Sequence, residues 1–223
     1  AAGDHPITRR ADRLEPPLRR AVIQSVEQVQ ASIDLSRLSD AIRSGHSIAT
    51  DDAAQVDALE LVGEVVRPLI LQACLLGADT ALTILHQISP PKQAKDIPVS
   101  LSTANPAAVA YARLQAAELV TITQQSARES IRVLISEGLA RGEHPDVIAR
   151  RIRPVIGLNE QQGMAVDSFY ARLVDTGKYT LEEMLARTDR YAVAKLRERA
   201  DMIARSECLP GETLVDTAMI QAV

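Results

Sequence analysis

Aromatic residues are scarce in this sequence of 223 residues. They make up 2% of it, as four Tyr, one Phe and no Trp, and this composition argues against a surface that stacks nucleic-acid bases on aromatic rings. Hydrophobic residues nevertheless reach 46%, which is enough to build a core. That core must be aliphatic and rich in Ala, which favours close-packed helices over a β-sandwich.

Cysteine is rarer still. Cys74 and Cys208 stand far apart and form no CxxC pair, which excludes a disulfide framework and a zinc ribbon. The four histidines are scattered without the spacing of metal ligands, so we expect neither a metal site nor a cofactor. The formal net charge is −4, and it gives no global attraction to nucleic acid.

Long uncharged apolar runs are also missing. The most apolar stretch, residues 61–88, contains Glu64, Arg67 and Asp79, which a membrane-spanning helix would rarely tolerate. We therefore expect a buried or partner-facing helix there and no membrane partner. The first residues lack the apolar segment of a signal peptide, which favours synthesis and retention in the cytoplasm.

In the first half of the chain, apolar residues recur at helical spacing. A helix is predicted from Leu18 to a break at residues 44–46, because Val22, Val26 and Val29 fall on one face. A second helix is expected to begin at residues 50–52, whose side chains can cap free backbone donors, and to stop at residues 89–91.

The second half predicts further helical stretches after residue 104. Asn105 and Pro106 suit the start of the longest helix, which continues to residue 138 over about 50 Å. A shorter helix follows Pro145. Capping boxes at residues 159–162 and 180–183 open the last two helices. The final helix has an apolar inner stripe, and its other faces carry Arg187, Arg190, Lys195, Arg197, Arg199 and Arg205.

These patterns predict an all-α, elongated helical bundle with long helices and a short β-type segment at its C-terminal end. The β-type segment is expected because Pro210 and Gly211 favour a turn and Thr, Val, Leu and Ile follow. The expected parts are a flexible arm, an N-terminal helical subdomain, a linker, a helical domain and the β-type segment: 1–17, 18–89, 90–104, 105–207 and 208–223.

Five segments of 105–207 follow one another in a distinctive order. They are Glu118-Leu-Val-Thr-Ile-Thr123, Ser130-Ile-Arg-Val-Leu-Ile135, Val147-Ile-Ala-Arg-Arg-Ile152, Gly157-Leu-Asn-Glu-Gln-Gln162 and Arg199-Ala-Asp-Met-Ile-Ala-Arg-Ser-Glu207. This order resembles the phage Mu F-like head morphogenesis proteins, which are minor capsid components of tailed phages and prophages. The sharpest of the segments is the closing Ile-Ala-Arg-Ser-Glu, in which the family usually has Thr at the position of Ser206.

The residues from Cys208 to Val215, Cys-Leu-Pro-Gly-Glu-Thr-Leu-Val, resemble the start of a Hint or intein-like domain. The resemblance implies that the Cys208 thiolate is a nucleophile that attacks the carbonyl of Glu207 to form a thioester. The His and Thr that this step needs would lie past Val223. The chain up to Val223 is therefore expected to be catalytically silent and not an enzyme in its own right.

The resemblance implies a structural protein of the virion, made in the bacterial cytoplasm, that docks at the portal vertex and assists head assembly or DNA ejection. Its partners would be the portal protein, other capsid components and packaged DNA, with several copies around a symmetric vertex. Two alternatives stay open: the delivery module of a polymorphic toxin released by Hint autoprocessing, and a helical nucleic-acid-binding module. The candidate contact residues are Arg150, Arg151, Arg153, Arg190, Arg197 and Arg205.

Overall fold

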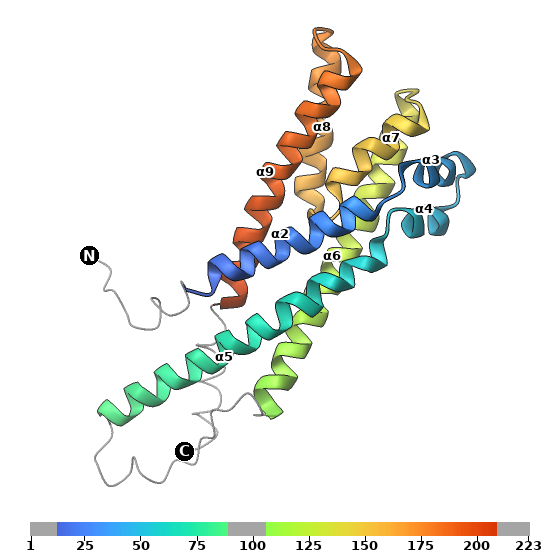
Figure 1. Cartoon of the computed structure of the whole chain (residues 1–223). Helices are drawn as coiled ribbons and strands as arrows, with labels where there is room; N and C mark the ends of the chain where they lie inside the picture. The colour runs from blue at the N-terminus through green and yellow to red at the C-terminus, as the bar shows by residue number, and fades with distance from the viewer. Residues whose placement is uncertain (1–12, 89–105, 209–223) are drawn as a thin grey trace. The chain divides into compact units, whose positions relative to one another are not determined.

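The computed structural model describes residues 13–88 and 106–208, and their regular structure is entirely helical (Figure 1). They form eight α-helices and two short 3-10 helices and contain no strand, which confirms the all-α prediction for this part of the chain. Of the β-type segment expected at 208–223, only Cys208 is described, and it is the last residue of a helix; residues 209–223 and the linker expected at 90–104 lie outside the described residues. No helix in the described ranges is both long and apolar enough to cross a bilayer.

The helices differ widely in length. The three longest, α5, α6 and α9, have 29, 35 and 28 residues, whereas α4 has 7. In order, the elements are α2 (Glu15–Ser32), α3 (Leu35–Ser44), α4 (Ser47–Ala53), η1 (Val56–Leu59), α5 (Glu60–Ile88), α6 (Pro106–Ala140), α7 (Pro145–Ile152), η3 (Arg153–Val155), α8 (Glu160–Thr176) and α9 (Leu181–Cys208).

Helix starts in the second half lie where the sequence predicts them. Pro106 is the first residue of α6, where its missing N–H costs nothing. The Asn159 side chain and Gln162 form the capping box of α8. The Thr180 hydroxyl accepts from the backbone N–H of Glu183, whose carboxylate accepts from the Thr180 N–H at 2.8 Å. Both predicted capping boxes are therefore confirmed.

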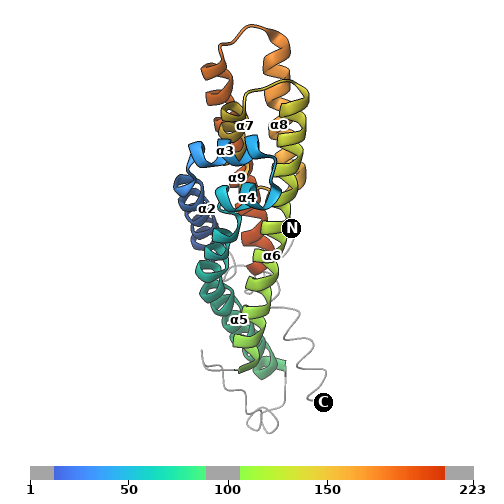
Figure 2. The same ribbon diagram turned by 90° about the vertical axis from the view of Figure 1, so that its right-hand side faces the viewer.

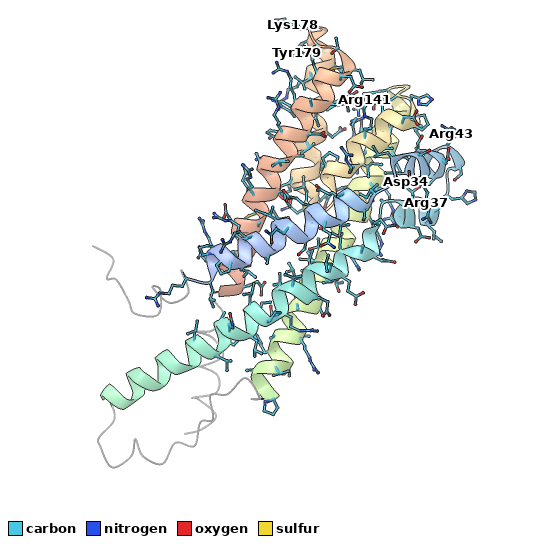
Figure 3. All side chains as sticks on the ribbon, in the orientation of Figure 1. Asp34, Arg37, Arg43, Arg141, Lys178 and Tyr179 are labelled. Atoms are coloured by element: carbon cyan, nitrogen blue, oxygen red, sulfur yellow. The ribbon has the colours of Figure 1, made fainter. Side chains whose placement is uncertain are left out.

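The first half contains two breaks that the sequence prediction missed. Asp34 ends the expected single helix, because its side chain accepts from the N–H groups of Ser36 and Arg37 and caps a new helix, α3 (Figure 3). The start predicted at residues 50–52 is also wrong, since α4 already begins at Ser47. Gln55 then takes a left-handed backbone conformation, with φ of 56°, between α4 and η1.

The described helices divide between two compact units, each built from segments far apart in the sequence. Among the described residues, the first unit comprises 13–21, 64–88, 106–118 and 200–208, and the second comprises 22–63 and 119–199. The domain boundaries inferred from the sequence stay predictions. In the first unit, segments of α2, α5, α6 and α9 bury the aliphatic residues Leu18, Val66, Ile70, Ala73, Ala112, Ala116, Ile203 and Ala204.

The second unit contains the shorter helices and most of the core. The α3 helix packs against α7, and both views show the two side by side (Figures 1 and 2). Aliphatic residues fill the interior, as the scarcity of aromatic residues predicts. The largest fully buried ones in this unit are Val22, Leu38, Leu59, Ile131, Leu134, Ile148, Ile152, Ile156 and Leu158.

Gly157 lets the connection between η3 and α8 approach α2 closely. Its φ is +90°, and a Cβ placed there would lie 2.5 Å from Cγ1 of Val26. Backbone conformation and space therefore both require glycine at this position. Nearby, the Gln30 side-chain amide donates to the carbonyl oxygen of Ile156 at 2.8 Å, which ties the same connection to α2.

We predict that Gly157→Ala lowers the free energy of unfolding by about 2–4 kcal/mol, since the methyl group meets Val26 and the backbone is strained. Urea unfolding followed by circular dichroism measures this. Gly177→Ala is the matched control: its φ is also positive, at +60°, but nothing lies within 4 Å of the added Cβ. It should cost about 1 kcal/mol, and an equal loss at both positions would contradict the packing argument.

Candidate functional site

The six arginines proposed as contact residues fall into two groups. One group lies on α7 and the 3-10 helix directly after it, and the other on α9. The three on α9 are exposed, whereas the α7 group ranges from half-exposed to fully buried. The first group is Arg150, Arg151 and Arg153; the second is Arg190, Arg197 and Arg205.

Arg150 and Arg153 lie at the C-terminal end of α7, where positive charge suits the helix dipole. Both terminal nitrogens of Arg150 donate to the Glu182 carboxylate at 2.7 Å, joining α7 to the first turn of α9. This hydrogen bond raises the pKa of Arg150 and lowers that of Glu182. Burial raises the pKa of Asp189, and the charge of Arg153 partly offsets that effect.

Arg151 is interior, with 1% of its side chain exposed. Its guanidinium donates to the carboxylates of Glu143 and Asp167, which are each 12% exposed. Its charge also lies over the ring of Tyr170, 4.1 Å from the ring centroid. The sequence analysis proposes Arg151 as a residue that contacts a partner. In the structure its side chain is part of the core.

Arg141, in the turn between α6 and α7, completes this group (Figure 3). It donates to Glu143 at 2.8 Å and to Asp167 at 3.1 Å. Burial disfavours its charge, but these two hydrogen bonds outweigh burial and raise its pKa. Two cations thus face the two buried carboxylates and balance their charge, while Arg141 also lies 3.5 Å from the exposed carboxylate of Glu137. We call Arg141, Glu143, Arg151, Asp167 and Tyr170 the ionic cluster.

The local sequence explains how the ionic cluster assembles. Gly142, with φ of +70°, turns the chain so that the residues on either side of it project toward α7 and α8. Arg151 lies three residues after the buried Ile148 and therefore shares its side of α7. The cluster ties the end of α6 to α7 and α8 by charge as well as by packing.

One face of α9 in the second unit combines arginine with apolar surface. Arg190, Val193 and Arg197 follow one another at i, i+3 and i+7 and are all exposed, Val193 by 38%. Within the described residues neither arginine forms an ion pair; Arg190 Nε donates only to the carbonyl oxygen of Ala186, at 3.2 Å. We call these three residues the α9 outer face.

An aromatic pair joins α8 to α9. The rings of Phe169 and Tyr191 stack with centroids 4.6 Å apart and an angle of 17° between their planes. Arg172 and Lys195 lie beside these rings, at 5.9 Å and 5.4 Å from the respective centroids. This stacked pair brings together two of the few aromatic residues of the chain and holds α8 against α9.

The turn that connects α8 and α9 contains Lys178 and Tyr179 (Figure 3). The guanidinium of Arg187, on α9, lies over the Tyr179 ring, 4.2 Å from its centroid. This contact holds the turn against the second turn of the helix, so the aromatic residues of this region support the pairing of the two helices.

Arg199 is buried and pairs with no carboxylate in the part of the chain that the structure describes. It was expected on an outer face of the last helix, but it is 7% exposed. It donates to the Thr123 hydroxyl at 3.2 Å, while its Nε has no hydrogen-bond partner among the described residues. Burial alone lowers its pKa. A buried cation with so little compensation destabilises the surrounding helices.

Ser39, Asp146 and His144 lie together but do not form a nucleophilic triad. The Ser39 hydroxyl donates to one oxygen of Asp146, and Nδ1 of His144 lies 3.2 Å from the other. The hydrogen bond from Ser39, aided by the charges of His144 and Arg43, lowers the pKa of Asp146. Because the carboxylate lies between the other two groups, the imidazole cannot take the serine proton directly.

The proposed nucleophile, Cys208, is the last residue of α9, one position beyond the predicted end of that helix. Its peptide bond to Glu207 therefore lies inside a helix, and its side chain lies outside the described part of the structure. The described side chains contain no group of three His, Cys, Asp or Glu residues placed to hold a metal ion. The other cysteine, Cys74, is buried as expected for a core residue.

Comparison with known proteins finds none that is similar to this chain. No protein family, no curated protein and no solved structure matches the chain.

We predict that Arg151→Met lowers the free energy of unfolding by about 3 kcal/mol or more, because it leaves two buried carboxylates with only Arg141 to balance them. Urea unfolding followed by circular dichroism measures the change. The matched control is Arg150→Met on the same helix, whose pair with Glu182 is exposed and should contribute little. Similar losses for the two variants would contradict a central role for the ionic cluster.

Arg199→Met is predicted to leave the free energy of unfolding unchanged or to raise it by about 1 kcal/mol, because an apolar chain of similar length replaces a poorly compensated cation. Arg197→Met, two residues away and exposed, should change it by less than about 0.5 kcal/mol. Chemical denaturation of both variants provides the test. A loss above about 2 kcal/mol for Arg199→Met would mean that the guanidinium has a partner it cannot do without.

Proposed function

We propose that this chain is a structural minor capsid protein of a tailed phage or prophage, of the Mu F-like head morphogenesis type. It would dock at the portal vertex and assist head assembly or DNA ejection. Support comes first from the resemblance of 105–207 to that family, whose sharpest segment, ending at Glu207, lies in the last two turns of α9.

The observation that carries a docking role is the α9 outer face. Arg190 and Arg197 are exposed without carboxylate partners among the described residues, and Val193 adds apolar surface between them. Arginine is enriched at protein interfaces because its planar guanidinium binds carboxylates in pairs of hydrogen bonds and also packs on apolar groups. A partner with an acidic, partly apolar surface fits this face.

The ionic cluster supports the same role indirectly. It joins the end of α6 to α7 and α8 within the second unit. The Arg150–Glu182 pair then joins α7 to the start of α9. A contact surface on α9 loses less conformational entropy on binding when the helices behind it are held in place.

A second candidate function is the delivery module of a toxin. It is favoured by the resemblance of the segment starting at Cys208 to a Hint domain, whose autoprocessing would release a toxin domain on its C-terminal side. A complete Hint domain joined to a toxin domain would support this function, and a sequence that ends soon after Val223 would remove it.

We predict that the double variant Arg190→Glu/Arg197→Glu weakens binding to the purified portal protein of the same phage or prophage by about tenfold or more, because like charges then face the acidic partner. Surface plasmon resonance with the full chain measures this. Arg37→Glu is the matched control, since Arg37 is exposed on α3 of the same unit and has no ion pair among the described residues.

Three outcomes of that measurement would count against the proposal. The first is no binding by the parent chain, and the second is equal binding by all variants. The third is binding of duplex DNA that falls steeply with salt while the portal protein is ignored, which would favour a nucleic-acid-binding module instead.

A further inference from the structure

The last turn of α9, in the first unit, contains a carboxyl group in an unfavourable place. Glu207 is the penultimate residue of the helix and is half-buried. Its Oε2 is buried and has no hydrogen-bond partner among the described residues. A buried carboxylate oxygen without a donor is costly, because water is lost and nothing replaces it.

The described groups that act on Glu207 or on its neighbours offer no positive charge. They are the Cys74 thiol on α5 and the Tyr111 phenol and Glu118 carboxylate on α6, each of which interacts electrostatically with Glu207 or with one another. On the neighbouring α2 helix, Arg19 pairs with Asp201 at 3.1 Å.

The cations of the adjoining helices are also directed elsewhere. Arg205, on α9 itself, is exposed. On α5, Arg67 pairs with Glu64 at 2.8 Å, and on α6 Arg113 is exposed. None of them contributes to the pKa of Glu207.

The helix end adds a further penalty. The C-terminal end of an α-helix carries partial negative charge from its free carbonyl groups, which disfavours a carboxylate in the last turn. Burial and the nearby charge of Glu118 raise the pKa of Glu207 above its ordinary value. Burial, the charge of Glu118 and the partial charge of the helix end all disfavour the ionised carboxylate. Each of these penalties disappears when Glu207 takes up a proton.

We infer that Glu207 makes the last turn of α9 a pH-sensitive latch, which packs against α5 and α6 when the carboxyl group is protonated and loosens when it ionises. The residues after Cys208 would then continue from an anchored helix end at acidic pH and from a frayed one at higher pH. All of the contacts involved lie within the first unit, so the latch does not depend on the proposed capsid role.

The direction of the pH effect follows from linkage. The pKa of Glu207 is higher in the packed turn than in an open one, so the packed turn binds the proton more tightly. Packing is therefore strongest below the ordinary pKa of Glu and weakens as the pH rises through the raised pKa. The thiol does not titrate in that range, because burial raises the pKa of Cys74 to about 11, and burial also raises the pKa of Tyr111.

The reactivity of Cys74 toward 4,4′-dithiodipyridine reports on this turn. The chain has two cysteines, so the full chain with Cys208→Ser keeps Cys74 as its single thiol. The labelling rate of a buried thiol follows the population of the open form. In the Glu207→Gln variant of this chain the charge is absent at every pH, while size and shape are kept.

The parent in this test is the full chain with Cys208→Ser. We expect the parent and its Glu207→Gln variant to react at equal rates near pH 4. At pH 8 the parent should react roughly threefold faster or more. Labelling takes place in the open form, where the thiol no longer lies beside Glu207, so dividing the two rates at each pH removes the change in thiolate concentration of that form. Glu198→Gln is the matched control, since Glu198 is exposed on the same helix, and it should follow the parent at every pH.

Glu118→Gln gives a second, independent readout. Removing the like charge should move the midpoint of the pH-dependent rate to lower pH without abolishing the transition. Equal rates for the parent and Glu207→Gln across the whole range would overturn the inference. An unchanged midpoint in Glu118→Gln would also overturn it, and this result stands even if Glu207→Gln fails to fold.

Discussion

The described structure depends most on the pairing of a buried guanidinium with two carboxylates. Arg151 could not stay 1% exposed unless Glu143 and Asp167 balanced its charge, and those two carboxylates are themselves largely buried. Arg141 supplies the second positive charge from the turn after α6. The cluster therefore determines how α7 and α8 sit against the end of α6.

Buried charge is handled differently elsewhere in the molecule. Arg199 has a single hydroxyl partner and no carboxylate, and Glu207 has a buried oxygen with no partner among the described residues. Arg151, Arg199 and Glu207 all lie on helices rich in exposed polar side chains, yet only the charge of Arg151 is balanced by groups of opposite charge. Neutralised charge fixes an arrangement of helices, whereas uncompensated charge leaves a helix end or a core position open to change.

The fold could be predicted where local signals determine it. Pro106 at the start of α6 and the capping box from Asn159 to Gln162 act within a few residues of themselves, and both lie as expected. The break at Asp34 was missed because an apolar stripe continues on both sides of it. A single Asp looks like surface until its side chain is seen to cap α3.

The candidate site was harder to predict for a physical reason. Among neighbouring arginines, the sequence does not distinguish Arg150, which is half-exposed, from Arg151, which is buried. The burial of Arg151 depends on carboxylates 8 and 16 residues away. Arg199 shows the same limit. It lies three residues after Leu196 and four before Ile203, both of which are buried. The spacing alone therefore indicates a buried position, but an arginine side chain is not expected in the interior.

The continuity of α9 from Leu181 to Cys208 has a consequence for how such a chain can change in length. Each residue turns an α-helix by about 100°, so one residue inserted after Ala192 would rotate all later side chains by more than a quarter turn. Leu196 would leave the interior, and Arg197 would no longer share a face with Arg190. Insertions of three or four residues nearly restore the angular register. Related proteins should therefore tolerate insertions of this length in the helix better than single-residue insertions.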